Sequence, residues 1–276
     1  MPARPQDLIF TLYGEYLLHR EEPIWVGSLI ALLQPFGLSE GAVRTVLSRM
    51  ARKGWLKAHR AGRHSFYDLA PKGRRLLEEG QARIFHPSWD TPWDGSWFLI
   101  AYSIPEDVRH LRDRLRDRLA WLGFGSLGNG LWISPHDVEE QVQSVAEQLE
   151  IECHLECFQA RRVNKQDAQE LVAKCWDLTT VNQQYLAFAE RWQSELERCS
   201  AGVPAGDVTH EECFAVRFDL IHEYRALPLI DPYLPRSLLP KQWHGEAATE
   251  LFHMLHEILK GPADSYVDQI LNTERS

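Results

Sequence analysis

The segment that most constrains the fold is the amphipathic stretch from residue 39 to residue 53. Apolar side chains recur there at helical spacing and predict one buried stripe, formed by Ala42, Val43, Val46, Leu47 and Met50. Apart from Glu40 in the first turn, the opposite face carries long cations and small hydroxyls, Arg44, Thr45, Ser48, Arg49 and Arg52. Ser39 is suited to cap the beginning of this helix, and Gly54 to end it.

Two further helices are expected before this segment, over residues 5–18 and within residues 27–37. Ser28 is a candidate cap for the second of them, and Gly37 can end it by taking a positive φ. Two helices joined by a turn that contains glycine are typical of a helix-turn-helix.

A β-hairpin is expected directly after the amphipathic helix. Residues 55–59 and 64–69 have strand character, and Arg60-Ala61-Gly62-Arg63 lies between them as a tight turn. Pro71 then suits the first turn of a helix that reaches about Phe85. Residues 1–85 are therefore predicted to form a winged helix-turn-helix domain.

The charge distribution favours nucleic-acid binding by this first domain. Residues 1–85 contain 13 Lys and Arg against 8 Asp and Glu, a net charge of +5, so the rest of the chain carries −14 of the total of −9. A solvated charged helix is the alternative, but such helices usually mix both signs. Cations neutralise phosphates and grip guanine, while hydroxyls reach either base type. The predicted DNA-binding residues are Arg44, Thr45, Ser48, Arg49, Arg52, Lys53, Arg60, Arg63 and His64.

The remaining chain predicts a middle domain and a helical C-terminal domain. Residues 86–96 form a linker with two prolines and two tryptophans. Strands over 97–103, 131–134 and 152–159, with helices over 106–121 and 137–149, predict a ferredoxin-like domain in residues 97–162. Residues 163–276 are expected to form an effector and dimerisation domain, with helices over 166–176, 179–198, 209–226 and 243–259. The fold class is α+β.

Three groups of segments together resemble one family, the phenylacetate-degradation repressors (PaaX). They are VRTVLSRMARKGWLKAHRAGRHSFYDL, then WDGSWFLIAYSIPE and WLGFGSLGNGLWISP, and then FDLIHEYRALPLIDPYLPRSLLPKQWHG. The resemblance implies the three domains above and a homodimer that binds double-stranded operator DNA and represses aromatic-catabolic genes. It also implies release by an aryl-CoA thioester, phenylacetyl-CoA in the type case.

A polar group at residues 222–225 is the candidate effector site. His222 and Arg225 are three residues apart and share a helix face, and arginine suits the phosphates and carbonyls of a CoA-like ligand. They line an effector pocket, or they form an internal hydrogen-bond network that holds their helix to the following DPYLP loop. An aryl group also needs aromatic walls, for which the candidates are Tyr224, Trp121 and Trp132.

Two enzymatic alternatives compete with the repressor hypothesis. The middle domain resembles the small CRISPR-adaptation ribonucleases, which would make the protein a metal-dependent nuclease. That family has a metal-ligating aspartate at the end of the first strand, where this sequence has Ser103, a poor ligand for a hard cation. Glu106 and Asp107 follow but belong to the start of the next helix.

An acyl-CoA-processing enzyme with His222 as its base is the other alternative. Recognisable nucleophile motifs are missing, so we expect no catalytic residues and no enzyme.

The cysteine and histidine patterns predict no metal and no cofactor. Five cysteines form no regular framework, and Cys153, His154 and Cys157 do not have the spacing of a zinc finger. His253 and His256 are a helical pair that we assign to an exposed face. The sequence has no apolar run of membrane-spanning length and no signal peptide, so a cytoplasmic protein without a membrane is expected.

Overall fold

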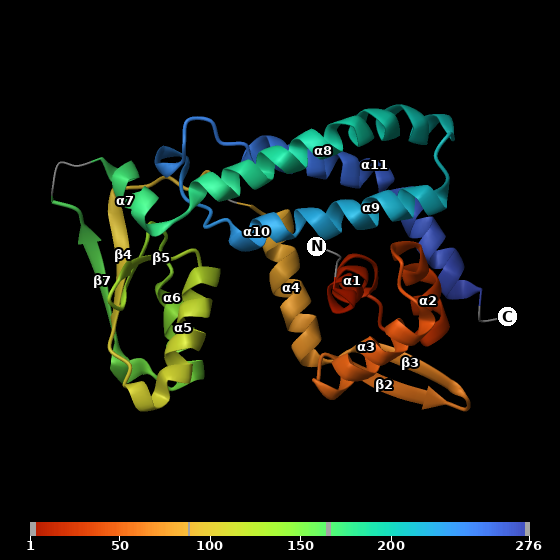
Figure 1. The fold of residues 1–276 in the computed structure, drawn as a ribbon, viewed down its shortest axis with the longest axis horizontal. Helices are drawn as coiled ribbons and strands as arrows, with labels where there is room; N and C mark the ends of the chain where they lie inside the picture. Colours follow the sequence, from red (N-terminus) through yellow and green to blue (C-terminus); the bar gives the residue numbers. More distant parts are fainter. Residues whose placement is uncertain (1–3, 88, 164–166, 274–276) are drawn as a thin grey trace. The chain divides into compact units, whose positions relative to one another are not determined.

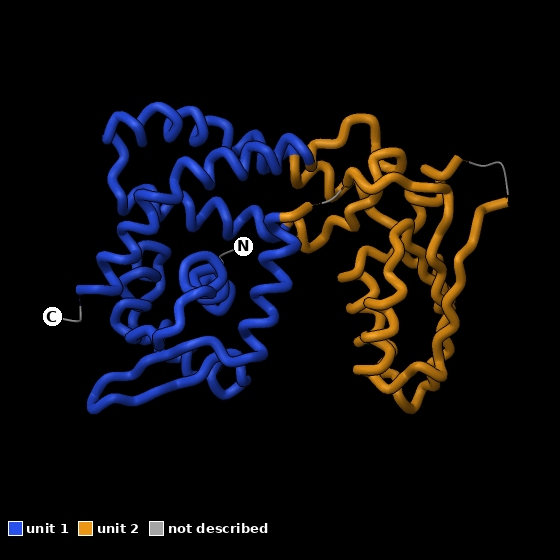
Figure 2. Tube along the Cα trace, turned by 180° about the vertical axis from the view of Figure 1, so that it is seen from behind, with its two compact units in different colours: residues 1–85, 186–226, 246–276 blue, residues 86–185, 227–245 orange. Residues whose placement is uncertain are grey.

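The computed structural model describes residues 4–87, 89–163 and 167–273 (Figure 1). It combines many helices with two small antiparallel sheets, an α+β organisation. The chain forms two compact units, and each is built from separate stretches of sequence (Figure 2). Unit 1 contains residues 1–85, 186–226 and 246–276, and unit 2 contains residues 86–185 and 227–245. Ser88 of the predicted linker and Gln166 of a predicted helix lie outside the described residues.

The first part of unit 1 contains four α-helices and a small three-stranded sheet. Their bounds are α1 (Pro5–Leu12), a π-helical turn (Tyr13–Leu17), β1 (Ile24–Trp25), α2 (Val26–Leu33), a 3-10 turn (Gln34–Phe36), α3 (Glu40–Arg52), β2 (Leu56–Ala61), β3 (His64–Leu69) and α4 (Pro71–Phe85). Strand β3 lies between β1 and β2 and pairs antiparallel with both. The predicted hairpin and the helix that begins at Pro71 are therefore confirmed.

The residues that begin and end the helices near α3 are those predicted from the sequence, with one exception. Ser39 accepts a hydrogen bond from the backbone N–H of Ala42 at 3.3 Å, and Gly37 takes a φ of 77°. The prediction that Ser28 caps α2 was wrong. The helix begins two residues earlier, at Val26, after Trp25, which provides no side-chain cap. Ser28 is buried inside the helix instead.

The second part of unit 1 is helical. Helices α8 (Leu178–Ala205) and α11 (Gly245–Asn272) begin in unit 2 and continue into unit 1, whereas α9 (His210–Tyr224) lies wholly in unit 1. Thr209 and Glu212 form a capping box at the beginning of α9. Helix α1 packs against both α3 and α9. Helix α11 extends to Asn272, beyond the predicted end at residue 259, because its apolar face continues past Pro262 with Ala263 and Val267.

Unit 2 contains a four-stranded antiparallel sheet with the strand order β5-β6-β4-β7. Its elements are β4 (Ser96–Tyr102), a 3-10 turn (Glu106–Val108), α5 (Arg109–Trp121), β5 (Gly125–Gly128), β6 (Leu131–Ser134), α6 (Glu139–Leu149), a 3-10 turn (Glu152–His154), β7 (Leu155–Arg161) and α7 (Ala168–Cys175), with α10 (Ala226–Ile230) and a 3-10 turn (Arg236–Leu238) returning later in the chain. Strand β5 (Gly125–Gly128) is not among the strands predicted from the sequence. It pairs with β6 through Gly125↔Ile133 and Ser126↔Trp132.

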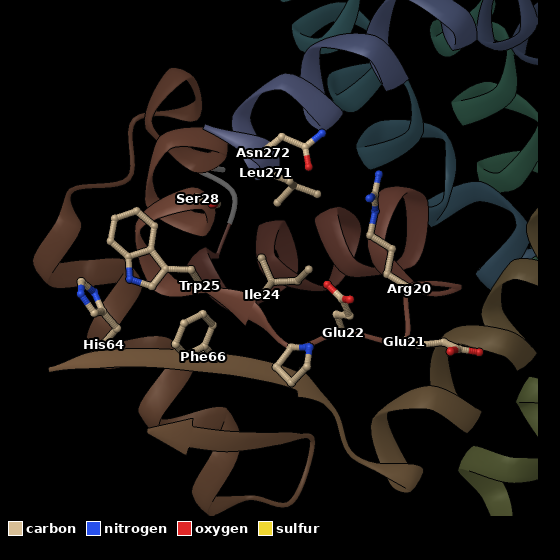
Figure 3. A pocket seen from close by; sticks show the side chains of 11 residues that line it. Arg20, Glu21, Glu22, Ile24, Trp25, Ser28, His64, Phe66, Leu271 and Asn272 are labelled. Carbon is tan, nitrogen blue, oxygen red and sulfur yellow. The ribbon is translucent and has the colours of Figure 1, made fainter. Parts of the chain in front are cut away.

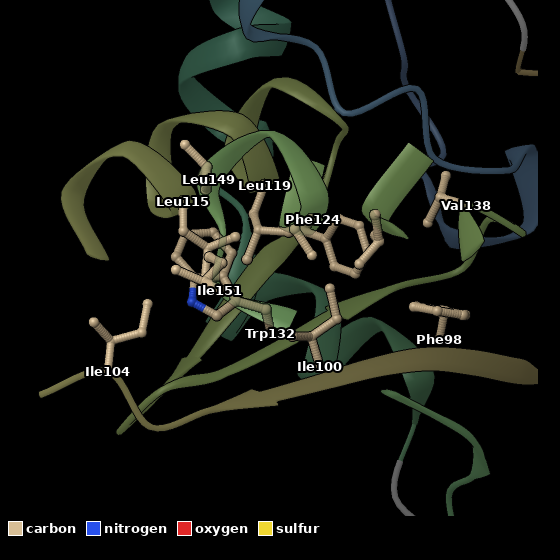
Figure 4. Close-up of a cluster of buried hydrophobic side chains, with 12 residues drawn as sticks. Phe98, Ile100, Ile104, Leu115, Leu119, Phe124, Trp132, Val138, Leu149 and Ile151 are labelled. Atoms are coloured by element: carbon tan, nitrogen blue, oxygen red, sulfur yellow. The ribbon is translucent and has the colours of Figure 1, made fainter. Parts of the chain in front are cut away.

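One face of this sheet packs against α5 and α6. Phe98, Ile100 and Trp132 on the strands contact apolar side chains of the two helices, and these residues form one buried cluster (Figure 4). On the other side of β5, a Cβ at Gly125 would lie 2.6 Å from the Cβ of Cys175, so α7 requires glycine for its close approach. No single helix in the described part of the chain is long and apolar enough to cross a membrane, although the bent pair of helical segments Val26–Phe36 and Glu40–Arg52 matches by length and composition.

Candidate nucleic-acid interface

Two consecutive helical segments of unit 1 meet at a sharp turn. The segment Val26–Phe36 and helix α3 are bent by 119° relative to each other at the break around Gly37. Val43, Val46, Leu47 and Met50 are all buried, whereas Ala42 is partly exposed. The stripe predicted from the sequence therefore faces the core and fixes which side of α3 meets solvent.

The exposed face of α3 carries the predicted residues side by side. All six are exposed: Arg44, Thr45, Ser48, Arg49, Arg52 and Lys53. The Nε of Arg44 donates to the Oε1 of Glu40 at 2.8 Å, one turn earlier. Thr45 donates its hydroxyl proton to the carbonyl of Gly41 at 2.7 Å, so its remaining lone pairs can still accept. This exposed ion pair is worth about 1 kcal/mol or less and uses one of the five N–H donors of Arg44, so the others can bind an anion.

Most cations of this surface are not neutralised by neighbours. Among the described residues, no salt bridge involves Arg49, Arg52 or Lys53. Helix α5 of unit 2 is different, because Arg109 and Arg112 pair with Glu106 and Arg109 also pairs with Asp113. The exposed face of α3 therefore offers uncompensated positive charge, as a polyanion requires.

The hairpin tip adds further cations. Ala61 pairs with His64 at the end of the ladder, and Gly62 takes a φ of 58° in the turn. Arg60, Arg63 and His64 are all exposed, as predicted for a hairpin that touches a ligand. The Nε of Arg63 lies 3.5 Å from the Nε2 of His64. Farther along the strands, His59 and Asp68 form a pair at 2.7 Å, which holds the two strands together.

The candidate effector residue His222 contacts the N-terminal helix. Its Nδ1 lies 2.8 Å from the Oγ1 of Thr11, and that hydroxyl already donates to the carbonyl of Asp7 at 3.0 Å. A hydroxyl has one proton to donate, so His222 acts as the donor to Thr11. Burial, together with the neighbouring Arg225 charge, lowers the pKa of His222 to about 4. An internal hydrogen-bond network at His222 therefore joins its helix to α1. The sequence analysis had expected such a network to hold this helix to the DPYLP loop.

The other candidate effector residues lie in different surroundings. Arg225 is partly buried beside His222, and burial lowers its pKa while Asp7 opposes that shift. Tyr224 is fully buried; its hydroxyl bonds to Thr249 at 2.7 Å and its ring stacks on Phe252 at 3.8 Å. A ligand cannot touch Tyr224 in this structure, because no part of it reaches solvent.

The two tryptophans proposed for the same pocket belong to unit 2. Trp132 is part of the buried cluster beneath the sheet, so it is a core residue and offers no surface to a ligand. Trp121 is partly buried at the end of α5. Since His222 and Arg225 belong to unit 1, the structure does not assemble the five predicted effector residues within one unit.

Sequence reasoning missed a buried ionic cluster in unit 1. Glu15, on the π-helical turn, accepts from Arg217 of α9 and from His256 of α11, both at 2.7 Å. The side chains of Glu15 and Arg217 are each only 4% exposed. Burial alone would raise the pKa of Glu15, but the hydrogen bond and charge of His256, together with Arg217, hold it below its usual range. The assignment of His256 to an exposed face was therefore wrong.

A single carboxylate within an apolar stripe was the available signal for this cluster. Glu15 is surrounded in the sequence by Tyr13, Tyr16 and Leu17, all of which are buried. A charge on a face of this kind is rarely buried unless it is paired. Within the described residues, no group of three or more His, Cys, Asp and Glu side chains is arranged to hold a metal ion.

Comparisons with known proteins agree with this architecture along the whole chain. Residues 4–73 match the model of PaaX-like proteins, residues 90–172 the PaaX central Cas2-like domain, and residues 176–269 the PaaX-like C-terminal domain. The chain is 34% identical over 272 residues to the transcriptional repressor PaaX of Escherichia coli K12, covering 98% of this chain and 84% of that protein. The chain belongs to the PaaX family.

A solved structure shares the fold of this PaaX-family protein. The uncharacterized protein Rv0674 from Mycobacterium tuberculosis matches with a TM-score of 0.58 and 22% sequence identity. The match covers 95% of this chain and 97% of that one. Identity at this level supports the common fold and carries no argument about activity.

Proposed function

We propose that this protein is a DNA-binding transcriptional repressor of an aromatic-catabolic operon of the phenylacetate type. The observation that carries the proposal is the exposed face of α3, where arginines and hydroxyls replace the mixed charges of a solvated helix. Membership of a family whose Escherichia coli relative is named a transcriptional repressor supports it. The protein acts by binding and not by catalysis, which is consistent with Ser103 at the end of the first strand of unit 2.

The first domain works as a winged helix-turn-helix. Helix α3 enters the major groove, with Arg44, Thr45, Ser48 and Arg52 nearest the bases. Arg49 and Lys53 hold phosphates beside them, while Arg60, Arg63 and His64 of the hairpin hold the backbone or the minor groove. The middle domain is ferredoxin-like, and the order β5-β6-β4-β7 supports this assignment. The protein binds two half-sites as a homodimer.

An aryl-CoA thioester such as phenylacetyl-CoA releases the protein from DNA. His222 and Arg225 remain the candidates for contact with this effector, because both are only partly buried and Arg225 has a charge suited to phosphate. Since His222 also contacts Thr11 of α1, a ligand at this pair would act on the helix that packs against α3. A hundredfold release from DNA needs about 2.7 kcal/mol of differential affinity between the two states.

The test is fluorescence anisotropy with DNA from upstream of the gene's own cluster, at two salt concentrations. Arg44→Ala should cost about 1–3 kcal/mol on the cognate site if Arg44 reads a base. Glu40→Gln is the matched control, because it frees Arg44 from its ion pair and should leave DNA affinity equal or higher. Phenylacetyl-CoA should lower the affinity of the unaltered protein. Sequence-blind binding that Arg44→Ala does not change would overturn the proposal, and binding that ignores the thioester would overturn only the effector.

A further inference from the structure

A cavity of about 680 Å³ lies in unit 1 where β1, β3 and the end of α11 meet. We propose that this cavity binds a small aromatic acid, with its ring at one end and its carboxylate at Arg20. The volume falls in the range of roughly 300–1,000 Å³ that is typical of small-molecule sites. None of its lining residues belongs to the DNA-binding or effector sets above except His64, which forms one wall.

One end of the cavity is aromatic. Trp25 of β1 and His64 of β3 face each other edge to face, with ring centroids 5.8 Å apart, and Phe66 lies beside them (Figure 3). The pairing Trp25↔Phe66 fixes these side chains on adjacent strands. A Cβ at Gly27 would lie 1.9 Å from the Trp25 ring, so the indole is folded back over the backbone of that glycine. Aromatic walls of this kind favour a flat ring through stacked or edge-to-face contacts.

Apolar and charged side chains form the rest of the cavity. Ile24 and Leu271 lie between the aromatic end and Arg20 (Figure 3). The guanidinium of Arg20 donates through Nε to the carbonyl of Tyr16 at 3.3 Å and through a terminal nitrogen to Asp268 of α11. A guanidinium has five N–H donors, so this leaves others for the carboxylate of a ligand.

The ion pair between Arg20 and Asp268 is suited to exchange. Both side chains are substantially exposed, at 38% and 53%, and exposed pairs contribute little to stability. A ligand carboxylate can therefore take the place of Asp268 at small cost, and a bidentate contact would bind more strongly than a single one. Because Glu21 and Glu22 also line the cavity, their negative charges oppose a dianion more strongly than a monocarboxylate.

The experiment is isothermal titration of the full-length protein without DNA, so that its outcome does not depend on repression. The probes are 1-naphthylacetate and its neutral analogue 1-naphthylacetamide. The acid should bind more tightly than the amide by about tenfold, as expected for a charge-assisted hydrogen bond. Absence of acid binding up to millimolar concentration would overturn the proposal.

Two variants of the ion pair provide the matched control. Arg20→Gln and Asp268→Asn break the same salt bridge, but only the first removes the cation. Arg20→Gln should lose the preference for the acid, so that both probes bind about equally, whereas Asp268→Asn should keep or increase the affinity for the acid. Equal losses of affinity for the acid in both variants would show that the salt bridge supports the fold rather than a ligand, and would refute the site.

A third variant tests the aromatic end. Trp25→Ala should lower the affinity for both probes by a similar factor, because it removes the wall that contacts the ring and leaves Arg20 unchanged. Leu76→Ala is the control, since Leu76 is an exposed apolar residue of α4 and does not line the cavity. Acid binding that survives in Trp25→Ala with unchanged affinity would place the ligand elsewhere and overturn the assignment.

Discussion

Arg217 and His222 of helix α9 both make polar contacts with the N-terminal helical segment, and these contacts differ in charge and burial. Near its middle, Arg217 pairs with Glu15, and both side chains are only 4% exposed. One and a half turns later, His222 meets the hydroxyl of Thr11, and this contact is neutral and partly buried. Asp264 of α11 adds a second carboxylate to Arg217 at 2.9 Å, whereas the His222 contact relies on a single hydroxyl.

The ionic contact holds the fold, whereas the neutral contact can change. A buried charge that loses its partner retains its full desolvation cost, so the Glu15–Arg217 contact behaves as a fixed connection between the helices. A neutral hydrogen bond beside solvent can be exchanged for water at small cost. The His222 contact is therefore the one of the two that a ligand could alter without unfolding unit 1.

The largest expected effect comes from removing the buried cation. Arg217→Met keeps much of the volume of the side chain but leaves Glu15 buried without its arginine, with His256 as its remaining hydrogen-bond partner. We expect a loss of about 3–5 kcal/mol in the free energy of unfolding, measured by urea denaturation followed by circular dichroism. Asp264→Asn is the control. The Asp264 side chain is 45% exposed, so its loss should cost no more than about 1 kcal/mol.

A double variant tests whether Glu15 and Arg217 stabilise the protein as a pair. Glu15→Gln combined with Arg217→Met removes both charges and should recover a large part of the stability lost by Arg217→Met alone. If the double variant is less stable than the single one by a further 3 kcal/mol or so, the two side chains do not act as a pair. That outcome would remove the distinction drawn between the two contacts of α9.

Different ranges of pH should separate the two contacts. The pKa of His222 is lowered to about 4 in the folded protein, whereas in the unfolded protein it is about 6.5. Between these two values the unfolded state binds the proton more readily, so stability decreases as the pH is lowered from about 6.5 to about 4. Glu15 has a lowered pKa as well, and its contribution is present above its unfolded pKa of about 4.3 and is lost as the pH falls through the folded value. His222→Gln should therefore flatten the stability profile between pH 6.5 and pH 4 and leave the steeper loss below it. An unchanged slope in that window would mean that His222 is not held neutral by the fold.

The same contrast explains how much of this molecule the sequence could predict. The exposed face of α3 and the hairpin follow from local rules, because periodicity, the Ser39 cap and Gly62 all act within a few residues. The Glu15–Arg217 pair joins residues that are 202 positions apart, and no local pattern specifies a partner at that distance. His256 illustrates the point, because its spacing from His253 gave no information about Glu15 on a different helix.

Strand β5 and the cavity near Arg20 were missed for related reasons. Gly125 and Gly128 have low strand propensity, and only pairing with β6 and the close approach of α7 make the segment a strand. The cavity combines residues from β1, β3 and α11, none of which is distinctive in its own segment. The π-helical turn at Tyr13–Leu17, which presents Glu15 to α9, also has no sequence signature of its own.

The smallest effect should come from the neutral contact itself. Thr11→Val preserves the shape of a side chain that is only 3% exposed but removes the oxygen that accepts from His222. Because His222 is partly buried, water can replace that acceptor in part, so we expect a loss of about 0.5–1.5 kcal/mol in urea denaturation. Thr11→Ser keeps the hydroxyl and should recover the part that belongs to the hydrogen bond. A loss as large as that of Arg217→Met would show that the Thr11–His222 contact is as fixed as the ionic one, and that a ligand at His222 could not alter it without unfolding unit 1.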